Sequence, residues 1–269
     1  MRRSQLYVPG NNEKMVSKAA SLNCDSVILD LEDAVPADQK KVARSLVCRL
    51  TEELEWDPRE VCVRINEVGT PEGAADIAGL RRTERLDTIV VPKAEKKIAE
   101  IYRETGKTVI PLIETPQGLM HIEDLLASEG VGGVSYGAAD FAMAVGGETS
   151  EYAENTYVKT RIAVAARAFG VEAIDNVFFD LDDQETFEAQ ARRAKALGFS
   201  GKQVIHPSQI PIANRVFFPT EEELEWAKKV VKAYRRAEAE GRGALRVDGR
   251  LVDKVHYRAA QRILGPREP

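Results

Sequence analysis

The sequence of 269 residues has little of what marks disulfide-linked, zinc-binding or membrane-spanning proteins. Its three cysteines, Cys24, Cys48 and Cys62, show no CxxC spacing. This excludes a disulfide framework and a structural zinc site, and indicates small buried side chains. No apolar run approaches the roughly 20 residues of a membrane span, and no apolar stretch follows Arg2 and Arg3 as in a secretory signal. We therefore expect a cytoplasmic protein with no membrane partner.

Two further absences narrow the possible functions. Neither glycine-rich phosphate loop, GxGxxG or GxxxxGK[ST], occurs in the sequence, which disfavours a doubly wound open sheet that binds nucleotides. An excess of basic residues is also missing, because 38 Lys and Arg stand against 43 Asp and Glu, with a net charge of -5. A partner nucleic acid is not expected, since it would need a basic face. A few local cations can still hold a small anionic substrate.

Short β-branched runs alternate with longer stretches of helical periodicity. The eight strand candidates are residues 4–8, 26–31, 61–66, 88–92, 109–113, 133–136, 173–179 and 203–206. Several are apolar on successive residues, as strands buried on both faces should be. Eight such units in a chain of about this length predict an α/β fold of the (β/α)8 TIM-barrel type.

A charged helix candidate runs from Thr220 to Glu240. The last stretch, residues 241–269, exceeds what eight such units need and contains a hairpin or extended arm at 243–249 and a final short helix at 254–264. We expect a barrel over residues 1–219. Residues 220–269 would form a C-terminal helical and hairpin extension that packs on the barrel and on a neighbouring subunit.

Polar residues collect where the predicted strands end, at the face where parallel barrels carry out chemistry. These residues are Asp30, Glu32, Asp33, Arg64, Asn66, Lys93, Glu114, Asp140 and His206. Glu114 and Asp140 follow adjacent strands and could bind one hard cation, and two carboxylates are typical of Mg2+ sites. With only three histidines in the sequence, zinc is disfavoured.

Arg64 and Lys93 supply positive charge that would face this cation. A metal ion and fixed cations together suit a carboxylate and a carbonyl whose oxygen becomes negative during reaction. Two alternatives stay open. Any one acid at a strand end can simply cap a helix, and Arg64 and Lys93 can pair structurally with Asp30 and Glu32.

Several segments resemble the citrate lyase beta-subunit family, which includes citryl-CoA, malyl-CoA and citramalyl-CoA lyases and related thioesterases. They are residues 4–11, 28–35, 63–66, 91–93, 112–115, 136–140, 198–206 and 249–253. The motifs DLEDAV and GKxxIHP are specific when taken together. The segments occur in order and cover nearly the whole chain.

The resemblance implies a Mg2+-dependent homotrimer or hexamer of barrels with shared active sites. It implies that Glu114 and Asp140 bind the metal and that Arg64 holds the carbonyl or carboxylate of a small 2-oxo acid. Backbone N–H groups around Ala138 and Ala139 would bind the substrate carboxylate.

The resemblance also assigns acidic residues to catalysis. Glu32 and Asp33 match an acidic loop behind the metal and its waters, and Lys93 would contact the substrate. Asp253 matches an aspartate lent across the subunit interface, which acts as acid or base at the α-carbon of the thioester.

The implied activity is a carbon–carbon lyase of retro-Claisen type, which cleaves or forms a 3-hydroxyacyl-CoA thioester from an acyl-CoA and a 2-oxo acid. Three alternatives remain at this point. They are a thioesterase of the malyl-CoA type on the same site, the beta subunit of a citrate lyase complex, and a non-catalytic barrel or another enolate enzyme. The sequence does not choose among oxaloacetate, glyoxylate and pyruvate.

Overall fold

The chain forms two compact units in a computed structural model that describes residues 1–56 and 59–265. The first unit is Met1–Phe217 and the second is Phe218–Pro269. The sequence placed this boundary after residue 219. Each unit is described by itself below.

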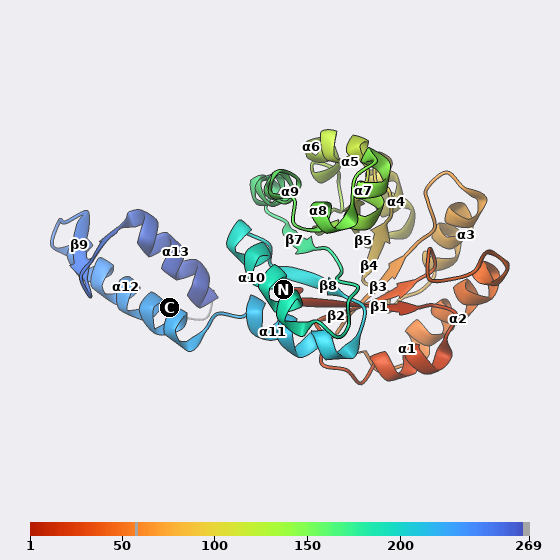
Figure 1. Ribbon diagram of the computed structural model, residues 1–269, viewed down its shortest axis with the longest axis horizontal. Coiled ribbons are helices and arrows are strands. Elements are labelled where there is room, and N and C mark those ends of the chain that lie inside the picture. Colours follow the sequence, from red (N-terminus) through yellow and green to blue (C-terminus); the bar gives the residue numbers. More distant parts are fainter. Residues whose placement is uncertain (57–58, 266–269) are drawn as a thin grey trace. The chain divides into compact units, whose positions relative to one another are not determined.

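Eight parallel strands close into a barrel in the first unit, in which β8 returns to pair with β1 (Figure 1). The strands are β1 (Ser4–Pro9), β2 (Ser26–Asp30), β3 (Glu60–Arg64), β4 (Thr88–Val91), β5 (Thr108–Ile113), β6 (Gly133–Tyr136), β7 (Glu172–Asp175) and β8 (Gly201–Val204). Each strand pairs with the next along the chain. The predicted (β/α)8 barrel is confirmed.

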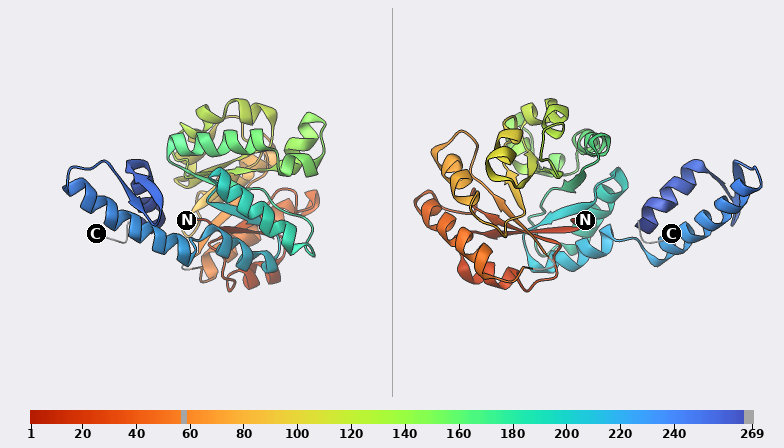
Figure 2. Two further views of the ribbon diagram at one scale, coloured as in Figure 1. Left: turned by 60° about the vertical axis from the view of Figure 1, so that its left-hand side comes forward. Right: turned by 180° about the vertical axis from the view of Figure 1, so that it is seen from behind.

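Helices surround the strands, as the two views of Figure 2 show. They are α1 (Glu13–Ala19), α2 (Lys40–Glu53), α3 (Pro71–Leu80), α4 (Ile98–Thr105), α5 (Pro116–Met120), α6 (Ile122–Leu126), α7 (Ala138–Val145), α8 (Thr149–Ala153), α9 (Thr156–Phe169), α10 (Gln184–Leu197) and α11 (Ile210–Phe217), with 3-10 turns η1 (Ala37–Gln39) and η2 (Pro207–Gln209). Thr70 and Thr115 cap α3 and α5, each just before a proline at the first helical position.

Four details of the strand prediction were wrong. β3 ends at Arg64, so Asn66 lies beyond the strand. β7 ends at Asp175, so Val177 and Phe179 lie in the following loop rather than in the strand. β8 ends at Val204, and His206 instead caps the turn η2 by accepting from the Ser208 N–H. Asp140 lies in the first turn of α7 and not at a strand end. His206 caps η2 and Asp140 lies in the helix that Gly137 caps, so in these two places a cap begins sooner than the apolar pattern suggests.

The barrel interior contains an apolar layer and is closed by charge at the N-terminal ends of the strands. The layer consists of Ile28, Cys62, Val90, Ile110, Leu112 and Ile174. Below it, Arg2 donates to Glu60 at 2.7 Å, to Glu172 at 2.9 Å and to the Gly132 carbonyl at 2.8 Å. Glu60 and Glu172 are the first residues of β3 and β7, so one guanidinium joins opposite parts of the barrel.

The second unit contains α12 (Glu221–Ala239), a hairpin of β9 (Ala244–Val247) and β10 (Arg250–Asp253), and α13 (Lys254–Leu264). Asp248 and Gly249 form the hairpin turn with φ of 45° and 84°, the left-handed values that Asp-Gly turns favour. Val230, Tyr234 and Val252 are among the residues of its own small core. The predicted helical and hairpin extension is confirmed.

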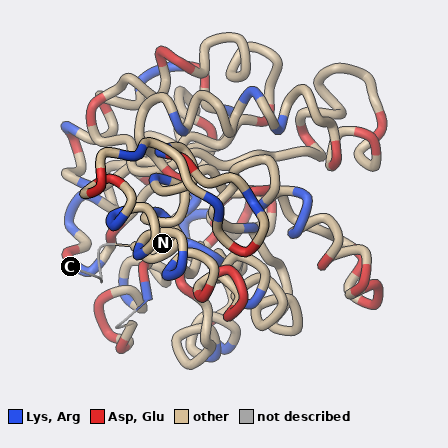
Figure 3. The backbone as a smooth tube through the Cα atoms, turned by 90° about the vertical axis from the view of Figure 1, so that its left-hand side faces the viewer, with Lys and Arg blue, Asp and Glu red and all other residues tan. Residues whose placement is uncertain are grey.

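Charged residues of both signs are interspersed along the chain (Figure 3). Among the described residues, no helix is both long and apolar enough to cross a membrane.

The Arg2–Glu60 pair should make stability depend on pH. Burial alone would raise the pKa of Glu60, but hydrogen bonds from Arg2, Ser26 and Thr88 and the charge of Arg2 lower it to about 2. A carboxylate with a lowered pKa stabilises the fold above its ordinary pKa of about 4.5 and loses this contribution as pH falls towards 2. Glu60→Gln should therefore lower the free energy of unfolding at pH 7 by up to about 3 kcal/mol.

Denaturant titrations at several pH values check this expectation. The difference between wild type and Glu60→Gln should shrink as pH falls from 5 towards 2. The exposed Glu84→Gln serves as the control and should differ little from wild type at any pH. A difference that does not change with pH would contradict the assignment.

Candidate active site

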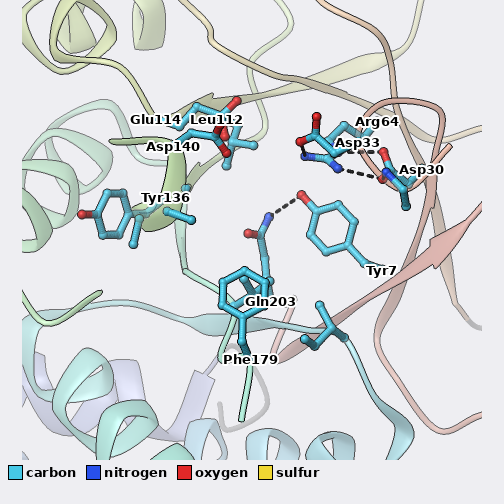
Figure 4. A pocket seen from close by; sticks show the side chains of 16 residues that line it. Tyr7, Asp30, Asp33, Arg64, Leu112, Glu114, Tyr136, Asp140, Phe179 and Gln203 are labelled. Carbon is cyan, nitrogen blue, oxygen red and sulfur yellow. Dashed lines mark hydrogen bonds and ion pairs between the residues drawn. The ribbon is translucent and has the colours of Figure 1, made fainter. Parts of the chain in front are cut away.

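A cavity of about 370 Å³ opens at the carboxyl ends of the strands (Figure 4). Its lining comes from every strand of the barrel or the segment that follows it, except β4: Tyr7, Asp30, Asp33, Ala34, Arg64, Leu112, Glu114, Tyr136, Gly137, Ala138, Ala139, Asp140, Val177, Phe179, Gln203 and Ile205. The cavity thus brings together Arg64, Glu114 and Asp140, as predicted from strand ends.

Glu114 and Asp140 place two carboxylates on one side of this cavity (Figure 4). Glu114 is only 2 % exposed, and its Oε1 accepts from the Lys93 backbone N–H at 2.7 Å. No residue in the described part of the chain donates to its Oε2 or to the Asp140 carboxylate. Burial, together with the charges of Glu32 and Asp140, raises the pKa of Glu114 to about 8. Ionised Glu114 therefore needs a positive partner.

The backbone around Glu114 is specialised to hold that side chain. A Cβ at Gly137 would lie 2.5 Å from Glu114 Oε2, so only glycine leaves room for the carboxylate. Lys93 has a φ of 44°, which is unusual for a residue with a side chain. This conformation accompanies the hydrogen bond from its N–H to Glu114. Strained backbone of this kind is common at functional sites.

The N-terminus of α7 also faces the cavity. Its cap, Gly137, has no side chain to satisfy the first N–H groups. Among the described residues nothing accepts from the N–H groups of Ala138, Ala139 or Asp140. Ala138 and Ala139 line the cavity, and a helix N-terminus with free N–H groups favours an anion. Their predicted contact with a substrate carboxylate is geometrically possible and stays a prediction.

Arg64 is held by the acidic loop that follows β2. Its guanidinium makes two 2.7 Å hydrogen bonds to Asp30, and it lies 2.9 Å from Glu32 and 3.3 Å from Asp33. Structural pairing, weighed above as an alternative, therefore does occur for Arg64. Two of its five N–H groups serve Asp30, and since Arg64 also lines the cavity, a role towards substrate stays open.

Lys93 and Glu32 stand behind the cavity and are absent from the lining given above. The Lys93 Nζ lies 2.9 Å from Glu32, and its backbone N–H holds Glu114. Direct contact of the Lys93 side chain with substrate stays untested. Glu32 contacts Arg64, and Lys93 holds Glu114 through its backbone N–H, so both residues position side chains of the lining.

Sequence reasoning missed four residues of the cavity lining, namely Tyr7, Val177, Phe179 and Gln203. Gln203 donates to the Tyr7 hydroxyl at 3.2 Å, and the Arg64 guanidinium lies 5.1 Å from the Tyr7 ring centre. Strand alternation gives a signal for Tyr7, because Leu6 and Val8 belong to the layer between strands and helices and Tyr7 must face inward. Val177 and Phe179 were assigned to the predicted strand 173–179, and nothing in the sequence marked them as residues of the cavity lining.

Asp253 lies in the second unit, where it caps α13. Its side chain accepts from the Val255 N–H at 2.9 Å and lies 2.7 Å from His256 Nδ1. The hydrogen bond with His256 lowers the pKa of Asp253, which keeps this partly exposed carboxylate ionised. The pairing with His256 was not predicted.

The donor set at Glu114 and Asp140 fits magnesium. Two carboxylates with no protein donor on their free oxygens lie in one cavity, and no cluster of three or more His, Cys, Asp or Glu suited to a metal exists among the described residues. A zinc site would use such a cluster. Magnesium commonly takes one or two protein carboxylates, with water and substrate oxygens completing the shell. Glu114 and Asp140 would hold it here.

A carboxylate pair, a helix N-terminus and an arginine at the carboxyl ends of a closed parallel barrel define a (β/α)8-barrel enzyme site suited to metal-assisted chemistry on a small anion. The family model described as HpcH/HpaI aldolase/citrate lyase matches residues 3–207. The chain belongs to this family, and the resemblance seen in the sequence is confirmed.

Known relatives cover nearly the whole chain. It is 34% identical to the mitochondrial citramalyl-CoA lyase of Homo sapiens, over 97% of this chain and 84% of the relative. It is 33% identical to the (3S)-malyl-CoA thioesterase of Cereibacter sphaeroides, over 99% and 94%. Among solved structures, CitE from Mycobacterium tuberculosis in complex with magnesium, acetoacetate and coenzyme A has a TM-score of 0.82 and 35% identity, over 97% and 96%.

Magnesium should stabilise the protein more as pH rises. The raised pKa of Glu114 means that the metal-free fold loses stability between about pH 4.5 and 8, where the folded protein retains a proton that the unfolded chain has released. Binding of Mg2+ requires the ionised carboxylate and releases this proton. The Mg2+-induced rise in Tm should therefore be larger at pH 8.5 than at pH 6.

Glu114→Gln should abolish this rise in Tm at both pH values. It should also remove the part of the fall in metal-free Tm with rising pH that the proton on Glu114 causes. The exposed Glu104→Gln is the matched control and should respond as wild type does. Thermal unfolding with Mg2+ and with EDTA measures both effects. An unchanged Mg2+ response in Glu114→Gln would show that the metal binds elsewhere.

Proposed function

We propose that this protein is a Mg2+-dependent carbon–carbon lyase that acts on coenzyme A thioesters. It cleaves, or forms, a 3-hydroxyacyl-CoA such as malyl-, citramalyl- or citryl-CoA, with an acyl-CoA and a 2-oxo acid as the other side of the reaction. The observation that carries the proposal is the carboxylate pair of Glu114 and Asp140 beside the free N-terminus of α7. Its likeness to the mitochondrial citramalyl-CoA lyase of Homo sapiens supports the proposal.

The reaction breaks the bond between the α-carbon of the thioester and the carbon that bears the hydroxyl group. A base takes the hydroxyl proton, the electron pair of the broken bond stays on the acyl-CoA as an enolate, and an acid protonates its α-carbon. Magnesium, when bound, would polarise the oxygen that becomes the 2-oxo group.

The residues of the chain supply position and charge for these steps. The N–H groups of Ala138 and Ala139 would hold the carboxylate next to the hydroxyl-bearing carbon. Arg64, fixed by Asp30 and Glu32, would direct the part of its guanidinium that its carboxylate partners leave free at the oxygen where negative charge develops. Glu32 and Asp33 act through Arg64 and the surrounding water.

A thioesterase is the second candidate, because one relative is a (3S)-malyl-CoA thioesterase. The same site would then direct water at the thioester carbonyl. The two activities differ in their products, since a lyase keeps the thioester bond and a hydrolase releases free thiol.

Incubation with malyl-, citramalyl- and citryl-CoA in the presence of Mg2+ tests the proposal. We expect acetyl-CoA and a 2-oxo acid in equal amounts from at least one of the three, with little free thiol, and no turnover in EDTA. Chromatography of the CoA species, a thiol reagent and a 2-oxo acid assay give the three readouts. Free thiol formed at the rate of substrate loss, without a 2-oxo acid, would favour the thioesterase.

The proposal includes assembly into a homotrimer or hexamer in which Asp253 of one chain serves as acid or base in a neighbouring site. Its support is the partly exposed carboxylate of Asp253, which lies in a second compact unit. A cytoplasmic location stays a prediction.

Complementation between two inactive variants tests the shared site. Asp253→Ala and Glu114→Gln should each lose activity, on the order of 10²-fold or more. After subunit exchange, mixed oligomers should regain part of the activity, because some sites combine an intact metal centre with an intact Asp253. Native mass spectrometry confirms exchange. Exchange without recovery would place Asp253 in its own chain's site or outside catalysis.

A further inference from the structure

Two tyrosines line the cavity, and their hydroxyl groups are used differently. A hydroxyl group can donate one hydrogen bond and also accept. Tyr136 donates to the Tyr152 carbonyl at 2.7 Å, and in Figure 4 its hydroxyl points away from the other labelled side chains. The Tyr7 hydroxyl instead accepts a hydrogen bond from Gln203 Nε2 at 3.2 Å. No described residue accepts its proton, which is therefore available to a bound molecule.

Gln203 fixes the direction of the Tyr7 hydroxyl. Gln203 is buried in β8, and the register of β8 with β1 pairs it with Gln5. Tyr7 lies one inward-facing position further along β1, towards the carboxyl ends of the strands. Because the amide N–H occupies one lone pair of the phenol oxygen, the hydroxyl proton must point elsewhere. Figure 4 shows this oxygen between Gln203 and Arg64.

The ring of Tyr7 is held in place by neighbours of two kinds. It packs against the inner apolar layer of the barrel described above, and the Arg64 guanidinium lies 5.1 Å from its centre. Asp30 in turn fixes Arg64 through two 2.7 Å hydrogen bonds. A donor that is fixed before substrate binds needs no reorganisation during the reaction. Such donors are the ones that stabilise a developing charge well.

The surroundings keep the Tyr7 hydroxyl protonated. Burial is the largest cause and raises the pKa of Tyr7 well above its ordinary value. The positive charge of Arg64 lowers this pKa, but the carboxylates of Asp30 and Glu114 raise it. A phenol of this kind is a hydrogen-bond donor at neutral pH and not a base. It can therefore stabilise negative charge on an oxygen while it keeps its own proton.

One oxygen of the substrate gains negative charge in both of the reactions considered above. In a lyase the thioester oxygen becomes negative when the acyl-CoA leaves as an enolate. In a thioesterase the same oxygen becomes negative when water adds to the carbonyl. The carboxylate pair and the α7 N-terminus would hold the metal and the small acid. The side of the cavity with Arg64 and Tyr7 is then left for the thioester.

We infer that Tyr7 is a catalytic residue, whose hydroxyl donates a hydrogen bond to the thioester oxygen while negative charge develops on it. Arg64 supplies the positive charge beside this donor, and Gln203 is the positioning residue that turns the hydroxyl towards the substrate. The inference rests on the proposed function and adds a residue to the same site. It applies to the lyase and to the thioesterase, because both reactions place charge on the same oxygen.

Tyr7→Phe removes the hydroxyl and keeps the ring, so its kinetics test the inference. Malyl-, citramalyl- and citryl-CoA are offered with Mg2+, and kcat and KM are measured on the thioester that wild type consumes fastest. We expect kcat to fall at least about 100-fold, the scale of losing one transition-state donor, with KM within about 3-fold of wild type. A lost ground-state contact would instead raise KM and leave kcat unchanged. Single-turnover measurements establish that the chemical step is slowed.

Two further tyrosine variants serve as controls. Tyr157→Phe, at an exposed position of α9, should keep the wild-type kcat. Tyr136→Phe removes the hydroxyl that the fold itself uses. It should lower Tm more than Tyr7→Phe does, and its loss in kcat should be at least about 10-fold smaller. Mg2+ should raise the Tm of Tyr7→Phe as much as that of wild type, because the hydroxyl is not a proposed metal ligand.

Gln203→Glu tests the direction of the hydroxyl. An ionised carboxylate can only accept, so the Tyr7 proton should turn towards it and away from the substrate. We expect kcat to fall at least about 10-fold. In a Tyr7→Phe background the same substitution should have little further effect. An effect of the added negative charge alone would be equal in the two backgrounds.

Three results would overturn the inference, and they can be told apart. A fall in kcat of less than about 10-fold in Tyr7→Phe, or a raised KM with unchanged kcat, would show that the hydroxyl is not catalytic and leave the proposed function intact. An equal effect of Gln203→Glu with and without the Tyr7 hydroxyl would refute the assigned direction of the donor. If wild type neither cleaves nor hydrolyses any of the three thioesters, the proposed function itself fails, and the inference with it.

Discussion

The site is organised around one buried carboxylate, of which only one oxygen accepts a hydrogen bond from the described chain. Glu114 is 2 % exposed, and only its Oε1 receives a hydrogen bond from the described chain. Keeping it there demands glycine at position 137 and left-handed backbone at Lys93. These are costs to folding that bring no packing in return. A bound cation would explain them, because it would supply the partner that Glu114 Oε2 lacks among the described residues.

The sequence predicted the parts of this arrangement that depend on periodicity. Eight apolar runs and their spacing gave the barrel, since a parallel strand must be buried on both faces. The barrel in turn placed Arg64 and Glu114 on one face, because all its strands end there. This placement follows from the topology of the barrel alone and needs no interatomic distance. The same reasoning placed Asp140 beside Glu114 but took it from a strand end, whereas it lies in the first turn of α7.

The sequence raised the pairing of Arg64 and Lys93 with Asp30 and Glu32 only as an alternative and could not give its geometry. Nothing in the order of residues says that Arg64 makes two hydrogen bonds to Asp30. Nor does it say that Lys93 donates to Glu114 from its backbone and to Glu32 from its side chain. These partners are set by the register of neighbouring strands and by single backbone angles. Val177 and Phe179 were missed for a related reason, since β7 ends at Asp175, four residues before the predicted strand end at Phe179.

The same electrostatic imbalance links the site to pH. The described lining carries three more negative than positive formal charges, and such a lining favours a divalent cation. Burial and the neighbouring carboxylates raise the pKa of Glu114 to about 8, so the metal-free protein relieves part of the imbalance by holding a proton there. A cation held by Glu114 and Asp140 would take the place of that proton. A proton and a metal ion therefore compete for the same buried carboxylate.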